Sequence, residues 1–115
     1  MEYVLLYFVD EAAERPPEYY EDAQEAITEW LADVRRRGVL KAGGRLRPVA
    51  EATTLSVRNG ETLIADGPFA ETKEQIAGFD LIECESLAEA QEIAAGHPAA
   101  WLGSVEIRPI WPLPE

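Results

Sequence analysis

Acidic, hydroxyl and basic side chains lie close together in the segment DGPFAETK, residues 66–73. Asp66 opens the segment with a carboxylate that can act as a general base if partial burial raises its pKa. Glu71, Thr72 and Lys73 then supply an acid, a hydroxyl and a cation, a set that can orient a polar ligand at the mouth of a pocket. The segment therefore predicts the rim of a binding site.

The same segment has an alternative interpretation as a simple turn. In the order Asp66-Gly67-Pro68, the aspartate can hydrogen-bond its own backbone, the glycine can adopt a positive φ, and the proline fixes φ. We expect Phe69 to hold this turn in place by being buried. Lys73 would then form a surface ion pair with a neighbouring carboxylate, a contact worth ~0–1 kcal/mol.

Two other segments carry side chains that can do chemistry. His97 is the only histidine, its unperturbed pKa lies near neutrality, and a cation there is favoured by the end of the helix before it. We take Asp66 and His97 as candidate catalytic residues, although a structural role is the alternative for each. Asp80 stands inside a predicted strand, so it either lines a pocket or faces solvent. Arg108 is its candidate ion-pair partner.

The sequence contains no recognisable signature for a metal or an organic cofactor. Cys84 and His97 are the only cysteine and histidine, so one chain cannot build a Cys/His zinc site. No carboxylate spacing indicates magnesium, and the glycine-rich and nucleophile motifs of nucleotide-binding proteins and hydrolases are absent. We therefore expect a cofactor-free protein without a metal site.

Composition limits the classes of partner. The 115 residues suit one domain spanning residues 1–115, and 10 Lys and Arg against 22 Asp and Glu give a formal charge of −12. Nucleic acids and anionic membrane surfaces both attract basic proteins, so we expect neither as a partner. A single cysteine, and no apolar stretch of ~20 residues, lead us to expect a cytoplasmic location.

Hydrophobic patterning predicts the elements that must position these residues. An apolar run predicts a first strand buried on both faces, Asn59-Gly60 predicts a hairpin turn, and Gly38 and Gly96 are expected to end helices. Ser86 and Glu89 form a predicted capping box. The predicted strands cover residues 2–9, 39–46, 53–57, 62–65, 76–84 and 104–110, and the predicted helices cover 17–37 and the segment between Ser86 and Gly96.

This order predicts an α+β fold of ferredoxin-like β-α-β-β-α-β type with an inserted β-hairpin. Two helices can cover one face of the resulting four-stranded sheet, yet the first strand is apolar on both faces. A second copy of the sheet is the simplest cover for the other face. We therefore expect a homodimer that forms a dimeric α/β barrel, with a cavity near the shared surface.

The segment ADGPFAETKEQIAGFDLIE, residues 65–83, resembles the signature of the YCII-related proteins of the DGPF type. The segments YVLLYFVDEAA, GVLKAGGRL, ATTLSVRNGET, HPAA and VEIRPIW occur in the same order and spacing as in that family. The resemblance covers nearly the whole chain. It implies a ferredoxin-like α+β fold that dimerises as an α/β barrel.

The resemblance also implies two kinds of function. The broader YCII group includes a dehydrochlorinase-type lyase acting on aromatic substrates, with a His on the first helix and an Asp in an Asp-Pro pair. Here the first helix has no histidine and His97-Pro98 occupies the Asp-Pro place, so this pair is not carried over. Our first hypothesis is a domain that binds a small-molecule ligand, as a lyase or isomerase in its enzymatic form. The alternative is an accessory protein, since some DGPF relatives accompany extracytoplasmic-function sigma factors.

Overall fold

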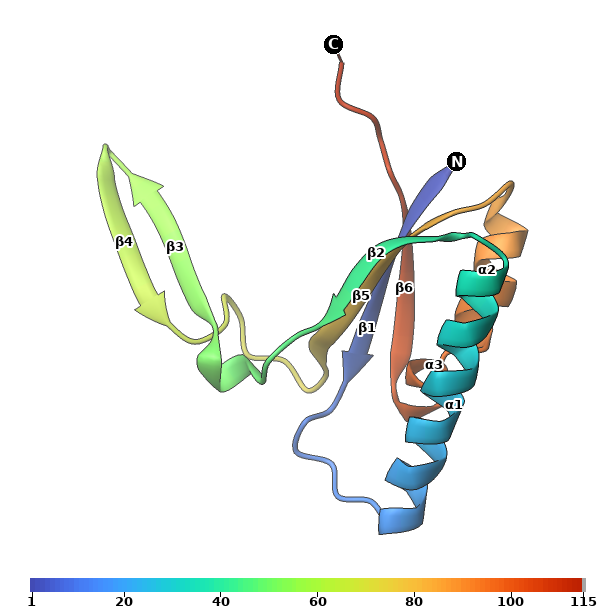
Figure 1. Ribbon diagram of the computed structural model, residues 1–115. Helices are drawn as coiled ribbons and strands as arrows, with labels where there is room; N and C mark the ends of the chain where they lie inside the picture. The colour runs from blue at the N-terminus through green and yellow to red at the C-terminus, as the bar shows by residue number, and fades with distance from the viewer. Residues whose placement is uncertain (115) are drawn as a thin grey trace.

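The computed structural model describes residues 1–114 and shows a mixed α+β architecture (Figure 1). Apart from η1 and α3, its elements match the predicted ranges to within about one residue. The elements are β1 (Glu2–Val9), α1 (Pro17–Arg36), β2 (Leu40–Arg45), the 3-10 turn η1 (Val49–Glu51), β3 (Thr53–Arg58), β4 (Glu61–Asp66), β5 (Gln75–Glu83), α2 (Leu87–Ala95), α3 (Ala99–Leu102) and β6 (Ser104–Pro109).

Four of the strands form one antiparallel sheet in the order β2-β5-β1-β6. The three α-helices all lie on one side of this sheet (Figure 1). With β3 and β4 set aside, the elements follow one another as β-α-β-β-α-β, which is the predicted order. The two central strands, β1 and β5, therefore carry the side chains that reach the middle of the helix-covered face.

The hydrophobic core lies between the sheet and the helices. Alternate residues of β1 face the helices, so Leu5 is completely buried, and α1 presents Trp30 and Val34 one turn apart toward the sheet. The indole N–H of Trp30 donates a hydrogen bond to the backbone oxygen of Ile93 at 2.8 Å, which ties α1 to α2. Burial of each such large side chain contributes about 1.5–3 kcal/mol.

Turn residues and the serine cap behave as predicted. Gly38 follows α1 with φ of 70°, and Asn59 and Gly60 adopt φ of 53° and 77° in the hairpin turn. The hydroxyl oxygen of Ser86 accepts a hydrogen bond from the Glu89 N–H at 3.1 Å, so it caps α2. Within residues 1–114, none of the helices has the length and apolar character that a membrane crossing requires.

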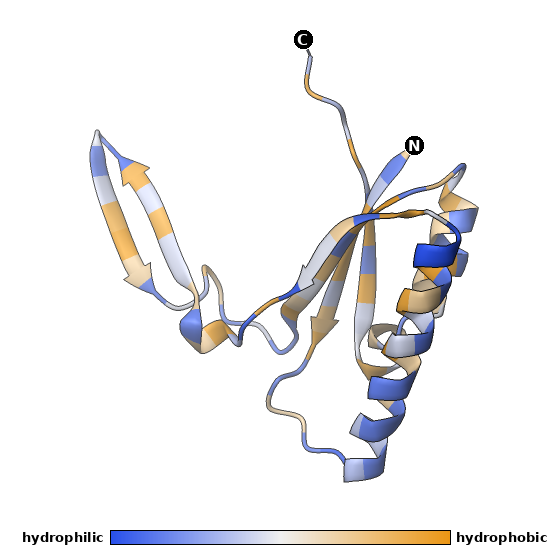
Figure 2. Cartoon of the chain, viewed as in Figure 1, coloured by the Kyte–Doolittle hydropathy of each residue, from blue (hydrophilic) through white to orange (hydrophobic). Residues whose placement is uncertain are grey.

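The hairpin β3–β4 projects away from the rest of the chain (Figure 1). It carries apolar bands, which Figure 2 shows in orange, and Leu55 and Ile64 are 59% and 66% exposed. The projection makes the chain extended, because its radius of gyration is 16.3 Å, whereas a compact domain of this length measures about 13 Å.

The connection from the hairpin to β5 contains the DGPF segment. Gly67 has φ of 101°, so it takes the positive φ that the turn interpretation requires. The expected burial of Phe69 is wrong for the single chain, since its side chain is 89% exposed. The connection runs outside the core, where no other apolar surface of the described residues covers the ring.

Candidate functional site

A cavity of about 970 Å³ lies between α1 and the sheet. We expected a cavity near a sheet-to-sheet dimer surface, but this one lies within one chain, on the helix-covered side. Gly43 and Gly44 of β2 line it, and Gly43, which is on the same face as Asp80, contributes no side chain to the space facing α1. Ile27 and Leu31 of α1 supply apolar lining opposite them.

Asp80 lies at the middle of this site on the central strand β5. It is opposite Leu5 on β1 and Gly43 on β2, and its side chain is only 8% exposed. The Tyr7 hydroxyl donates a 2.6 Å hydrogen bond to Asp80 Oδ2. A Cβ atom at Gly43 would lie 1.8 Å from Asp80 Oδ1, so the carboxylate occupies the space that a side chain there would need.

The surroundings change the proton affinity of both partners. Burial raises the pKa of the Asp80 carboxyl, and the hydrogen bond from Tyr7 opposes that rise. Burial also raises the pKa of the Tyr7 hydroxyl, which the hydrogen bond to Asp80 and its negative charge raise further. Tyr7 is therefore a permanent hydrogen-bond donor at neutral pH, and Asp80 is a carboxyl group with increased proton affinity. Such a group suits general acid–base chemistry.

His97 completes the cluster from the segment between α2 and α3. Its ring stacks on the Tyr7 ring, with centroids 3.8 Å apart and planes 12° apart, and the Trp30 ring contacts it edge-on at 4.8 Å. Burial lowers the pKa of His97 to about 4. The sequence argument that the helix end favours a cation here is therefore wrong, because the loss of hydration outweighs the helix dipole.

The tautomer of His97 follows from its backbone contact. The Ala99 N–H donates a hydrogen bond to Nδ1 of His97 at 3.0 Å. Nδ1 must therefore carry a lone pair, and the neutral ring holds its proton on Nε2. Since His97 lines the cavity, this Nε2–H is the donor that it can offer to a ligand.

Comparison with known proteins places the chain in a family. The sequence model of the YCII-related domain matches residues 1–114. The chain belongs to the YCII-related family. It is 40% identical over 118 residues to an uncharacterized protein of Rhizobium meliloti (strain 1021), an alignment that covers 96% of this chain and 92% of that protein.

A solved structure shares the fold of this YCII-related chain. It is the 5-chloro-2-hydroxyhydroquinone dehydrochlorinase of Burkholderia phenoliruptrix AC1100, in complex with 2,5-dihydroxybenzoquinone. The TM-score is 0.51 at 16% sequence identity, and the match covers 96% of this chain and 94% of that one. At this identity the likeness concerns the fold alone.

Of the seven residues predicted to form the site, the structure brings together two, Asp80 and His97, at this cavity. The others lie outside its lining: Asp66, Glu71, Thr72, Lys73 and Arg108. Asp66 ends β4 in the projecting hairpin, and the three loop residues are exposed on the connection to β5. The expectation that this loop forms the rim of a pocket therefore does not hold for the cavity of the single chain, because the loop runs out toward the hairpin.

The proposed pair between Asp80 and Arg108 is wrong. Arg108 lies 3.3 Å from Glu106 on its own strand, and both side chains are largely exposed. It is opposite Val4 on β1, whereas β5, which carries Asp80, lies on the other side of β1. The Asp80 carboxylate accepts a hydrogen bond from the Tyr7 hydroxyl instead.

Tyr7 is the functional residue that the sequence analysis missed. The hydrophobic pattern indicates only a core residue, because Tyr7 falls on an apolar face of the first strand. The signal that could have found it is chemical, since a buried tyrosine hydroxyl and a buried carboxylate each need a hydrogen-bond partner. Pairing β1 with β5 would have identified the Tyr7 hydroxyl and the Asp80 carboxylate as possible partners.

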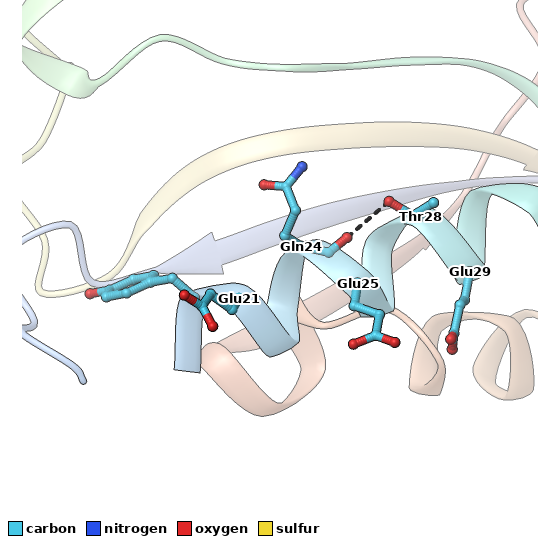
Figure 3. Close-up of a pocket in the computed structure, with 6 residues that line it drawn as sticks. Glu21, Gln24, Glu25, Thr28 and Glu29 are labelled. Carbon is cyan, nitrogen blue, oxygen red and sulfur yellow. Dashed lines mark hydrogen bonds between the residues drawn. The ribbon is translucent and has the colours of Figure 1, made fainter. Parts of the chain in front are cut away.

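Figure 3 shows a second hollow, of about 670 Å³, along α1. Every lining residue belongs to this one helix: Tyr20, Glu21, Gln24, Glu25, Thr28 and Glu29. The Thr28 hydroxyl donates a hydrogen bond to the backbone carbonyl oxygen of Gln24 at 3.0 Å. A single helix provides only one wall, so we assign no site there. Among residues 1–114, moreover, no group of three or more His, Cys, Asp or Glu side chains could hold a metal ion.

Proposed function

We propose that the cavity binds a small molecule and that Asp80, Tyr7 and His97 act on it. The observation that carries this proposal is a buried carboxylate and hydroxyl, with a half-buried imidazole beside them, at the wall of a cavity of about 970 Å³. Burying polar groups costs stability, and ligand pockets fall in the range of about 300–1,000 Å³. A ligand site accounts for both features.

The geometry supports proton transfer without a cofactor. Asp80 takes a proton from a carbon of the substrate, Tyr7 holds the carboxylate in position, and the Nε2–H of His97 donates to a substrate oxygen that gains negative charge. In an elimination, the electron pair of the broken C–H bond forms a double bond and the leaving group departs with its own bonding pair. In an isomerisation, Asp80 returns the proton to a different atom.

The dehydrochlorinase that shares the fold favours the elimination, since its name describes loss of hydrogen chloride from an aromatic compound. A lyase or isomerase activity is therefore the enzymatic form that we propose. Neither the fold nor the relatives supply an observation that favours an accessory role beside a sigma factor, and we do not propose one.

We also propose that the protein is a homodimer that closes into an α/β barrel. The face of β1 away from the helices carries Val4, Leu6 and Phe8, which are only half-buried, and no helix covers it (Figure 1). The exposed apolar residues of the hairpin add to the uncovered surface. A second copy would cover on the order of 1,200–2,000 Å² or more.

A thermal-shift screen of small metabolites against the wild type and Asp80→Asn tests the proposed function. Compounds that bind only the folded state raise its melting temperature, and we expect hits whose effect is weakened by Asp80→Asn. For such a hit, NMR in D₂O should show solvent exchange of a carbon-bound proton with the wild type and roughly 10²-fold less with the variant. A screen in which every hit stabilises both proteins equally would contradict the proposal.

A further inference from the structure

The lining of the cavity carries a small excess of basic residues although the whole protein is strongly acidic. Four of the ten Lys and Arg residues line it, but only three of the 22 Asp and Glu residues do so. The basic residues are Arg15, Arg35, Lys41 and Arg45, and the acidic residues are Asp10, Glu11 and Asp80. With a formal charge of −12 on the whole chain, this local excess of cations favours an anionic ligand.

Arg45 lies on the same face of the sheet as the Tyr7–Asp80 pair. It is opposite Gly78 on β5, which is itself opposite Tyr7 on β1, and paired residues of neighbouring strands share a face. Gly43, two residues before it on β2, approaches Asp80 Oδ1 from that same face.

Gly78 lies between Arg45 and Tyr7 in the paired strands. A Cβ atom at Gly78 would lie 2.9 Å from the Gly44 carbonyl oxygen, 3.5 Å from the Cα of Arg45 and 3.6 Å from Cδ2 of Tyr7. A side chain here would collide with the backbone of β2, so the glycine lets β2 pack closely against β5, and no β5 side chain separates Arg45 from Tyr7.

The guanidinium of Arg45 has no acidic partner among residues 1–114, where the ion pairs within 4.0 Å involve other basic residues. A guanidinium stays charged at any physiological pH and matches the two oxygens of a carboxylate with parallel N–H donors. Ile27 and Leu31 supply apolar lining in the same cavity, which suits the body of a small organic acid.

We propose that Arg45 determines the specificity of the site by binding the carboxylate of a small organic acid with an apolar body. The bound acid would lie with its carbon skeleton between α1 and Asp80. This inference rests on the proposed function, because it names the class of molecule that the same cavity takes.

Binding of sodium benzoate and of its neutral isostere benzamide, measured by ligand-observed NMR, tests the inference. We expect the wild type to bind benzoate about tenfold more tightly than benzamide, since charge-assisted hydrogen bonds are the stronger ones. Arg45→Gln should abolish this preference and leave the affinity for benzamide within about twofold. Arg36→Gln removes the same charge from an exposed position that pairs with Asp33, and it should change neither affinity.

Three results would overturn the role of Arg45. They are equal affinity of the wild type for the two probes, an equal loss of affinity for benzoate in Arg45→Gln and Arg36→Gln, or no binding of benzoate to the wild type at millimolar concentration. Protein-observed NMR of His97 separates the two proposals: in the first case, if both probes shift its signals, the cavity still binds small molecules and only the specificity inference fails. If neither probe shifts those signals and the metabolite screen also gives no hit, the proposed function fails as well.

Discussion

At the scale of single residues, the site depends on three side chains that modify one another. Tyr7 satisfies Asp80, and its ring covers one face of His97. Asp80 and His97 can be identified from residue type alone, as an acid inside a strand and a lone histidine. Tyr7 cannot, because its contact with Asp80 depends on the pairing of β1 with β5, two strands far apart in the sequence, which local patterning does not reveal.

His97 should titrate far from the normal range for a histidine. Its folded pKa is about 4 against an ordinary value of 6.5, because burial disfavours the imidazolium. Between these values the unfolded chain binds more protons than the folded chain, so this residue lowers stability as pH falls from about 6.5 toward 4. As the only histidine, it gives one unambiguous NMR titration. A midpoint near 6.5 would show that the ring is hydrated.

Tyr7→Phe should reduce the free energy of unfolding by about 1–3 kcal/mol, because it leaves a buried carboxylate oxygen of Asp80 without its donor while keeping the aromatic ring. Tyr20→Phe is the matched control, since its hydroxyl makes an exposed hydrogen bond to Ala13 and should cost no more than about 0.5 kcal/mol. Urea denaturation of both variants measures the difference. Equal losses of unfolding free energy would show that the buried hydrogen bond stabilises the protein no more than the exposed one.

At the scale of elements, β2 is shaped around the carboxylate of its neighbour. In the sequence, Gly43 and Gly44 indicate a weakened strand with a bulge or a close approach of the backbone. The structure shows the close approach at Gly43, whereas the irregularity of the strand lies earlier, between Leu40 and Ala42. Turn chemistry at Gly67 was predictable for the same local reason. The position of the DGPF loop was not, because it depends on where the whole hairpin points.

Gly43→Ala should destabilise the protein by about 1–3 kcal/mol and displace Asp80, because the added Cβ would lie 1.8 Å from Oδ1 and 2.7 Å from the Phe79 carbonyl oxygen. Gly44→Ala is the adjacent control, since nothing lies within 4 Å of its added Cβ. We expect its unfolding free energy to stay within about 0.5 kcal/mol of the wild type. Similar urea unfolding curves for the two variants would contradict this account of the site.

At the scale of the whole molecule, one chain leaves much apolar surface uncovered. The order of the elements along the chain and the layering of helices on one side of the sheet (Figure 1) follow from the sequence pattern. The direction in which the hairpin projects does not, because β3 and β4 form a two-stranded sheet separate from the four-stranded one. A second copy is the cover that we propose for both the hairpin and the open face of the sheet.

Val57→Asp combined with Ile64→Asp should dissociate the proposed dimer, since both side chains are more than half exposed and a charge at an apolar interface is costly. Ser56→Asp adds a charge on the other face of the same strand and should leave the dimer intact. Light scattering should give twice the 12.8 kDa chain mass for the wild type and the control, and 12.8 kDa for the double variant. A monomeric wild type would refute the dimer.

A crystallographic fragment screen tests most directly whether the cavity beside Asp80 and His97 is a small-molecule site. Soaked crystals of the wild type reveal where small organic molecules bind, even while the natural ligand is unidentified. We predict that bound fragments gather in this cavity, with a polar atom within hydrogen-bond distance of Asp80 or of His97 Nε2. Fragments bound only elsewhere, such as along the outer face of α1, with the cavity empty, would contradict the account.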